Sequence, residues 1–305
     1  MSFSSDTKIE LCKETPRNSC CQKAECYGLL LFGRAFSGHA ITLTTESGAA
    51  AHLAAQLTAE TIGVIVDLSA SVLRRKERKN AFTVTINGSE QRSAVLDFFG
   101  HDQKEMNLRI NHSNMEDECC ASAFLRGAFL SCGTVTDPAK DYRLEFTVPF
   151  MNLARDLSAF ISGIYELDLQ PGLLNRKGAF VVYIKGGERV ADFLTYMGAG
   201  NAAMELMQAK MLKEVRNNVN RKTNFETANI DKTASAAAAQ IIAIEKIRNT
   251  AGLDALPEEL REIADLRYRN PDMSLRELGG ALSEPLSRSG VNHRLQRIVD
   301  IAGSL

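Results

Sequence analysis

The sequence predicts an α+β fold in which a duplicated αββαββα unit is followed by a smaller all-α domain. The main observation is a fourteen-residue pattern that occurs twice, at 20–33 and 119–132. In addition, the chain has 305 residues, more than one hydrophobic core usually organises, while the two copies account only for residues up to about 210. We therefore expect a repeated domain over 1–212 with copies at about 19–100 and 118–199, a linker over 213–233, and a second domain over 234–305.

Each copy begins with a predicted helix that carries a stripe of small residues. The stripe consists of Cys20, Ala24 and Gly28 in the first copy and of Cys119, Ala123 and Gly127 in the second. Because residues four positions apart lie on one face of a helix, two such stripes allow close backbone packing. We expect these two helices to pack against each other.

The rest of each copy contains strand and helix signals in the same order. In the first copy they predict strands at 39–45, 63–73 and 81–86 and helices at 48–62 and 89–99, the last one capped by Ser89. In the second copy they predict a strand at 142–148, a helix at 150–164, a hairpin tip at 175–178, a strand at 179–184 and a helix at 188–197. Two twisted sheets related by a pseudo-twofold axis are expected.

The C-terminal segment predicts a small helical domain. The expected elements are helices at about 234–250, 257–269 and 275–282, a turn at 283–286 and a last helix at about 288–301. Ser274 and Glu277 form the pattern of a capping box, and Ser287 is placed to cap the last helix. The final two helices have the length and apolar spacing of a helix-turn-helix.

The last helix has a polar face that suits DNA. Val291, Leu295 and Ile298 face inward at helical spacing, and no acid occurs from 287 to 299. Arginine and asparagine are the residue types that form bidentate contacts with guanine and adenine. The candidate DNA-binding residues are Ser274, Arg276, Ser287, Arg288, Ser289, Asn292, His293, Arg294 and Arg297. A solvated polar face on a small helical domain is the alternative.

Composition limits the other classes of function. With 36 Lys and Arg against 37 Asp and Glu, the net charge predicts neither nucleic-acid nor membrane binding, so a basic surface must be local. No apolar run approaches the about 20 residues of a membrane span, and the N-terminus lacks the apolar core of a signal peptide. The expected location is the cytoplasm, in association with the nucleoid.

The seven cysteines lack the spacing of metal ligands. The pairs Cys20–Cys21 and Cys119–Cys120 are products of the repeat, at helix positions where a small buried residue fits. We therefore expect structural cysteines, with no metal and no cofactor.

The paired helices resemble the LAGLIDADG motif of homing endonucleases. The similar segments are CYGLLLFGR at 26–34 and LRGAFLSCG at 125–133. In that family the penultimate acidic residue of each motif helps to hold the metal ion for phosphodiester cleavage, whereas this chain has Gly33 and Cys132 there. Hard divalent cations prefer oxygen ligands, which these two residues do not supply. We therefore expect no catalytic residues and no nuclease activity.

In an endonuclease-like arrangement the predicted hairpins lie along the DNA. The candidates for contacts with the DNA backbone are Arg74, Arg75, Lys76, Arg78 and Lys79 in the first hairpin, Arg176 and Lys177 in the second, and Asn220, Arg221 and Asn224 in the linker. Charged hairpin tips also keep proteins soluble and protect sheet edges, and an Asn-rich linker is also compatible with an unstructured tether.

The whole chain resembles the WhiA family of bacterial regulators, which combine a degenerate LAGLIDADG domain with a C-terminal helix-turn-helix. Besides the two motifs, the segments NRKTNFETAN at 220–229 and SRSGVNHR at 287–294 carry the resemblance. It implies a transcription factor linked to cell division, chromosome segregation and, in spore-forming lineages, sporulation.

The sequence is compatible with three classes of function to different degrees. The first is a transcription regulator that binds double-stranded DNA at promoter or chromosomal sites. The second is a scaffold whose repeated domain binds another transcription factor or polymerase. The third, an active endonuclease, is disfavoured by the missing carboxylates. We expect a monomer, because the internal helix pair already buries the faces that a homodimer would use.

Overall fold

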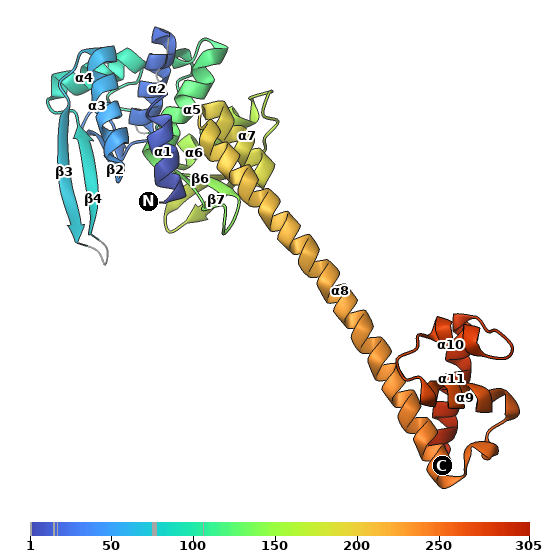
Figure 1. Cartoon of the computed structure of the whole chain (residues 1–305). Helices are drawn as coiled ribbons and strands as arrows, with labels where there is room; N and C mark the ends of the chain where they lie inside the picture. The colour runs from blue at the N-terminus through green and yellow to red at the C-terminus, as the bar shows by residue number, and fades with distance from the viewer. Residues whose placement is uncertain (1, 15, 17, 75–77, 106) are drawn as a thin grey trace. The chain divides into compact units, whose positions relative to one another are not determined.

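The computed structural model of the chain describes residues 2–14, 16, 18–74, 78–105 and 107–305, and the side chains of residues 72–79 lie outside that description. The chain divides into two compact units, the first ending at Glu214 and the second beginning at Val215. Figure 1 labels their helices and strands. Each unit has a hydrophobic core of its own.

The first unit contains the αββαββα order of elements twice. The first copy consists of α2 (Ser19–Leu31), β1 (Ala35–Phe36), β2 (Ile41–Thr45), α3 (Gly48–Ile62), β3 (Asp67–Arg74), β4 (Arg78–Thr85) and α4 (Ser89–Phe99). The second consists of α5 (Glu118–Cys132), β5 (Gly133–Val135), β6 (Arg143–Val148), α6 (Met151–Ser162), β7 (Gly172–Arg176), β8 (Ala179–Lys185) and α7 (Gly187–Met197). Helix α1 (Phe3–Leu11) precedes the first copy, and the short helix η1 (His112–Asn114) lies between them. The predicted α+β duplication is confirmed.

Each copy forms one four-stranded antiparallel sheet. The strand orders β1-β2-β4-β3 and β5-β6-β8-β7 are equivalent. Leu43 pairs with Val84 in the first sheet, and Leu144 pairs with Ile184 in the second. All four side chains are buried, as expected for strands whose alternate residues face the core.

The small-residue stripes bring α2 and α5 into backbone contact, side by side in Figure 1. A Cβ atom added to Gly28 would lie 2.3 Å from the carbonyl oxygen of Phe124, and one added to Gly127 would lie 2.2 Å from that of Glu25. Beside this contact, the fully buried Glu25 carboxylate accepts hydrogen bonds from Nε and Nη2 of Arg126 at 3.0 and 2.8 Å. A buried ion pair therefore joins the two copies.

Three details of the first unit differ from the prediction. Strands β1 and β5 have two and three residues, too few for an alternating pattern to reveal them. Ser89 does not cap α4, because Gly88 is the N-cap residue and has a φ of 83°. Helix α1 has a largely polar sequence, but Phe3, Thr7 and Leu11 are buried at a spacing of four residues.

The remaining elements are all helical. They are α8 (Gly200–Thr250), η2 (Leu253–Ala255), α9 (Glu258–Arg269), α10 (Leu275–Ala281) and α11 (Arg288–Ser304). In the part of the chain that the structure describes, no helix has the length and apolar character needed to cross a membrane.

Helix α8 begins at Gly200, not near residue 234, and is continuous through 213–233. This segment contains neither Gly nor Pro, the residues that most strongly interrupt a helix. At the start of α8, the Glu10 carboxylate accepts hydrogen bonds from the backbone N–H groups of Asn201 at 2.7 Å and Ala202 at 3.0 Å. The alternative of an unstructured tether is therefore wrong, while a linker role for 213–233 stays a prediction.

Candidate nucleic-acid interface

The predicted helix-turn-helix forms from α10, the turn after it and α11. Ser274 Oγ accepts a hydrogen bond from the N–H of Glu277 at 3.3 Å, and Glu277 Oε2 accepts one from the N–H of Ser274 at 2.8 Å. Ser287 Oγ accepts a hydrogen bond from the N–H of Gly290 at 3.2 Å and so caps α11. Both predicted caps are confirmed, and they define where the two helices begin.

Apolar side chains at helical spacing hold these helices together. Val291, Leu295 and Ile298 of α11 are fully buried, and Leu278 of α10 belongs to the same core. This core also contains Leu260 of α9. The inward face predicted for α11 is therefore confirmed, which leaves its opposite face to solvent.

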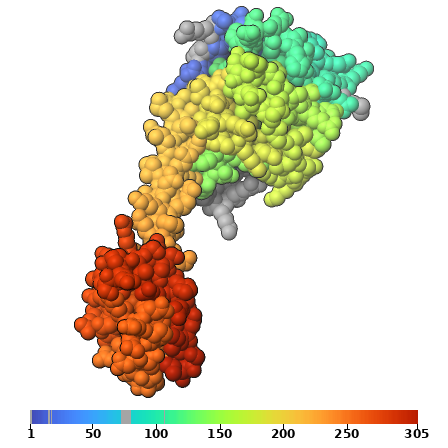
Figure 2. Space-filling model, turned by 90° about the vertical axis from the view of Figure 1, so that its right-hand side faces the viewer, coloured from blue at the N-terminus to red at the C-terminus, as the bar shows by residue number. Residues whose placement is uncertain are grey.

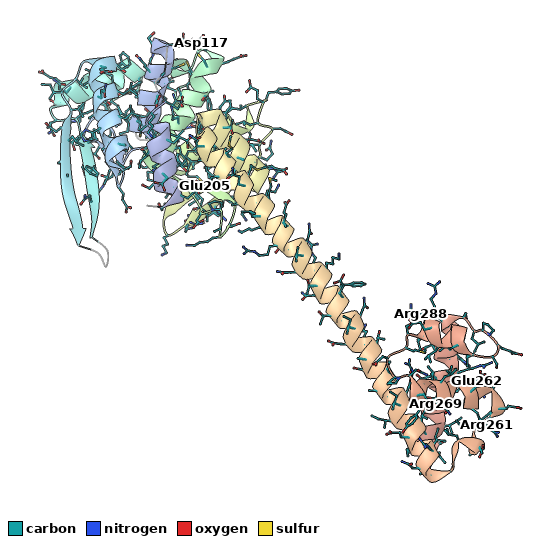
Figure 3. The ribbon with its side chains drawn as sticks, in the orientation of Figure 1. Asp117, Glu205, Arg261, Glu262, Arg269 and Arg288 are labelled. Carbon is teal, nitrogen blue, oxygen red and sulfur yellow. The ribbon has the colours of Figure 1, made fainter. Side chains whose placement is uncertain are left out.

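The turn between α10 and α11 is held by contacts on both sides. The N–H of Leu286 donates to the carbonyl oxygen of Gly279 at 3.0 Å, and a Cβ atom on Gly279 would lie 2.3 Å from the carbonyl oxygen of Leu286. The Glu262 carboxylate of α9 accepts hydrogen bonds from the N–H and the hydroxyl of Ser283 at 2.6 and 2.7 Å. These hydrogen bonds lower the pKa of Glu262, which is labelled in Figure 3. The turn thus has a defined geometry.

The outer face of α11 carries exposed polar side chains near its N-terminal end. Arg288, Ser289, Asn292 and His293 are exposed, and Figure 3 places Arg288 at the outer edge of the unit. Arg276 of α10 is exposed as well. In Figure 2 the dark red residues of the C-terminal segment form a continuous part of this unit's surface. The first two turns of α11 therefore present donors and acceptors to an outside partner.

Two other predicted cations, Arg294 and Arg297, contact α9. Arg297 Nη1 lies 2.5 Å from Glu259 Oε1, and Arg294 Nη1 donates to the backbone carbonyl oxygen of Glu259 at 3.1 Å. Although 287–299 contains no acid, the tertiary structure thus places a carboxylate beside it. A phosphate that binds Arg297 must compete with Glu259.

Two acids of α9 that shape this surface, Glu259 and Glu262, are not among the residues predicted for the site. Glu259 contacts Arg297 across 38 positions, and Glu262 contacts Ser283 across 21. No local pattern marks partners at such separations. The sequence contains only a weak signal for these contacts, namely two acids three positions apart on a helix that lies before the arginine-containing last helix.

The cations predicted for the second sheet are partly neutralised. Arg176 forms two hydrogen bonds with the Glu145 carboxylate, both of 2.9 Å, and Arg143 pairs with the same carboxylate. Burial opposes the ionisation of Glu145, but the two arginines hold its pKa below the usual range. Lys177 is exposed at the turn after β7. The side chains of Arg74, Arg75, Lys76, Arg78 and Lys79 lie outside the described residues.

The linker candidates Asn220, Arg221 and Asn224 are exposed on α8. Arg221 Nη2 donates to Oδ1 of Asn218 at 3.2 Å. Because Asn220 and Asn224 are four positions apart on a helix, they share one face.

A cleft of about 820 Å³ lies at the C-terminal end of α5, where the endonuclease motif would hold a metal. Cys132, Glu46 and Lys8 belong to its lining. Burial raises the pKa of the Cys132 thiol to about 12, so the sulfur is neutral at pH 7. Lys8 Nζ donates to the carbonyl oxygen of Leu130 at 3.1 Å and brings a hydrogen-bond donor to this site. A protonated thiol and an amino group are poor ligands for a hard divalent cation, which leaves Glu46 as the carboxylate among the described lining residues of this cleft.

Four cysteines meet at the opposite, N-terminal ends of α2 and α5. We call Cys20, Cys21, Cys119 and Cys120 the thiol cluster, since their sulfur atoms all lie within 4.8 Å of one another. The expectation that all four are buried is wrong for Cys119, which is exposed, and for Cys20, which is half-buried. The repeat contained the missed signal, because equivalent positions on two packed helices come together.

The fold and the C-terminal surface define a class of protein in which a duplicated LAGLIDADG-like domain is followed by a helix-turn-helix domain. Two family models match the chain: the WhiA LAGLIDADG-like domain over 121–216 and the WhiA C-terminal HTH domain over 219–302. The chain belongs to the WhiA family.

Several relatives are similar to this chain over nearly its full length. The probable cell division protein WhiA of Ruminiclostridium cellulolyticum is 38% identical over 99% of this chain and 97% of the relative. That of Alkaliphilus oremlandii is 38% identical over 100% of this chain and 98% of the relative. The crystal structure of full-length DUF199/WhiA from Thermatoga maritima is 27% identical, with a TM-score of 0.60, and the match covers 100% of this chain and 99% of that chain.

Proposed function

We propose that this protein is a sequence-specific DNA-binding transcription regulator, linked to cell division and without nuclease activity. One observation carries the proposal: Arg288 and Asn292 are exposed one turn apart at the capped end of α11. In helix-turn-helix proteins the N-terminal residues of the second helix contact base edges in the major groove. The names of the relatives support the link to cell division. Roles in chromosome segregation or sporulation, and a nucleoid location, belong to the same proposal.

Base recognition is tested in the full-length protein. Its preferred site is first selected from genomic DNA by sequencing the fragments that the protein retains. We expect Arg288→Ala and Asn292→Ala each to weaken binding to that site by about 1–3 kcal/mol, or about 5- to 140-fold, and to reduce discrimination against other sequences. Circular dichroism checks the fold, which should persist because neither residue is buried. Folded variants with unchanged discrimination would remove α11 from the recognition role.

Arg297 has a different expected role, because it lies two turns beyond the start of α11 and contacts Glu259. We expect Arg297→Ala to weaken binding to all sequences alike, with a smaller slope of log affinity against log salt. Arg269→Ala is the matched control, since Arg269 is an exposed arginine of α9 that pairs with Asp265. A sequence-dependent loss in Arg297→Ala would contradict a backbone role.

The cations of the two hairpins test whether the repeated domain binds DNA or another protein. Neutralising Arg74, Arg75, Lys76, Arg78 and Lys79 together should flatten the salt slope of DNA binding if this hairpin contacts phosphates. Replacing Lys177 alone gives a second, independent measurement in the other sheet. An unchanged slope in both variants would exclude phosphate contacts at these cations and favour the scaffold function.

A scaffold is the second candidate function, and one surface of the first unit favours it. Tyr165 is 96% exposed beside a cleft of about 510 Å³ that also includes Phe160 and Tyr196. Exposed aromatic side chains next to a cleft are typical of protein interaction sites. Tyr165→Ser should leave DNA affinity unchanged and abolish binding to a transcription factor or polymerase if the scaffold role applies.

The absence of nuclease activity is tested with magnesium and manganese. We expect the purified protein to leave supercoiled plasmid intact, because the C-terminal end of α5 carries the neutral Cys132 thiol where the endonuclease motif has a carboxylate. Nicking that survives repeated purification and responds to a Cys132→Ala change would overturn this part of the proposal.

A further inference from the structure

The thiol cluster differs from cysteines that only fill a core. Cys21 and Cys120 are buried, whereas Cys20 is half-buried and Cys119 is exposed. Free cysteine normally behaves as a small buried hydrophobic residue. Thiols that meet at the protein surface are therefore open to a cation from solvent.

The sulfur positions approach those of a tetrahedral thiolate site. Zinc–sulfur bonds of about 2.3 Å place the four sulfur atoms of a tetrahedron about 3.8 Å apart. The Sγ atom of Cys119 lies 3.9 Å from that of Cys20 and 3.3 Å from that of Cys21, and no pair in the cluster exceeds 4.8 Å. The first two distances differ from the tetrahedral value by about 0.5 Å or less, and the widest pair exceeds it by at most about 1 Å.

The two helix starts favour the negative charge of such a site. Four thiolates around one divalent cation have a net charge of about −2. Each helix supplies two of the ligands from its first turn, where the backbone N–H groups and the helix dipole stabilise anions. The N-cap residues Asn18 and Asp117 make no side-chain hydrogen bond to their own helices, so cap side chains do not occupy these N–H groups. The Asp117 carboxylate accepts a hydrogen bond from the Cys20 thiol instead, and this contact must break when the thiol binds a cation. Figure 3 labels Asp117 at this end of the helix pair.

We propose that the thiol cluster binds one zinc ion, which links the two copies of the repeated unit at the N-terminal ends of α2 and α5. A tetrahedral set of four soft thiolates selects zinc over the hard cations of nucleases. Each thiol that binds releases its proton to solvent, so no oxidant or reductant is required. The cation is structural, because all four positions around it are taken by protein.

Metal content and cobalt spectroscopy test the proposal on the untagged full-length protein. We expect about one zinc per chain after purification under reducing conditions. Cobalt added to the reduced, metal-free protein should produce thiolate charge-transfer absorption and the intense d–d bands of tetrahedral cobalt, saturating at about one equivalent. Zinc should then abolish both signals. Zinc should also raise the melting temperature of the first unit, since it binds only the folded site.

Variants identify the ligands. Cys119→Ser is the first choice, because an exposed side chain tolerates replacement, and it should weaken zinc binding by at least about 100-fold. Cys12→Ser/Cys132→Ser is the matched control, since both residues lie outside the cluster, and it should keep one equivalent of zinc. If Cys119→Ser does not fold, the wild-type protein is alkylated with and without zinc instead. Zinc should then protect Cys20 and Cys119 from the alkylating reagent.

Four results would overturn the proposal. They are a folded, reduced wild-type protein that binds neither zinc nor cobalt, equal binding by Cys119→Ser, bound iron in place of zinc, and a protein as purified that holds a disulfide between cluster cysteines in place of metal. Such a disulfide would join Cys21 and Cys119, because their sulfur atoms are 3.3 Å apart and need only about 1 Å of movement to bond.

Discussion

The contact between α2 and α5 makes a quantitative prediction for Gly127→Ala. The added Cβ atom would lie 2.2 Å from the carbonyl oxygen of Glu25 and 2.9 Å from the backbone nitrogen of Leu29. A carbon atom normally stays about 3.3 Å from such an oxygen, so the helices must separate by about 1 Å. Neither contact atom is the end of a flexible side chain, so rotation cannot relieve the clash.

The expected cost follows from two opposing effects. Overpacking costs about 1–3 kcal/mol, and backbone contacts place this site at the upper end. Separation also disturbs the neighbouring ion pair, in which Arg126 and Glu25 atoms lie 2.8 and 3.0 Å apart. Alanine regains about 1 kcal/mol of helix propensity over glycine. The net loss is therefore about 2 kcal/mol, which lowers the melting temperature of a unit of this size by about 4–8 °C.

Calorimetry and urea unfolding measure this loss, with the transition of the first unit followed separately from that of the second. Gly28→Ala should lower the stability of the first unit by a similar amount, because its Cβ atom would lie 2.3 Å from the carbonyl oxygen of Phe124. Gly200→Ala is the control in the same unit, since a Cβ atom there meets nothing within 4 Å. If Gly127→Ala melts at or above the wild-type temperature while the control is neutral, the backbone contact between the helices is refuted.

Three further predictions concern single interactions. Ser274→Ala should lower the free energy of unfolding of the second unit by about 1 kcal/mol through loss of the capping box, and an unchanged urea midpoint would exclude that role. Glu25→Gln should destabilise the first unit by several kcal/mol because it leaves Arg126 buried without its carboxylate, whereas a loss below about 1 kcal/mol would show that water replaces the pair. Burial opposes the ionisation of Asp156, but hydrogen bonds from Arg109 and a backbone N–H hold its pKa below the usual range. The stability that wild type has over Asp156→Asn should therefore be complete above about pH 5 and disappear as the pH falls below about 4; a constant difference in urea midpoint across this range would contradict the ion pair.

Local patterns predicted the elements that depend on neighbouring residues. The capping box at Ser274 and the cap at Ser287 act within one helical turn, so residue type and spacing were enough to place both helix starts. The inward face of α11 followed in the same way from the spacing of its apolar residues. The repeat predicted two equivalent sheets, because equal sequences of elements fold alike.

Two backbone features differ from what the local residue types indicated. The Asn-rich composition of 213–233 placed the start of the next helix near residue 234, yet α8 begins at Gly200 and is continuous through this segment. Ser89 has the residue type of an N-cap, but the adjacent Gly88 reaches the positive φ that the start of α4 needs. In both cases a neighbouring or missing residue type decided the backbone conformation: Gly88 beside Ser89, and the absence of Gly and Pro in 213–233.

The sequence by itself determined the duplicated architecture, the helix-turn-helix and the membership of the family, since each rests on periodicity, capping or similarity along the chain. Only the tertiary structure decided that Glu259 pairs with Arg297, that Lys8 reaches the C-terminal end of α5, and that the thiol cluster forms at the N-terminal end. Periodicity and capping act over a few residues, whereas ion pairs and ligand sites require side chains from distant segments to meet. Which segments meet is fixed by the packing of whole helices against one another, and that packing is a property of the folded core.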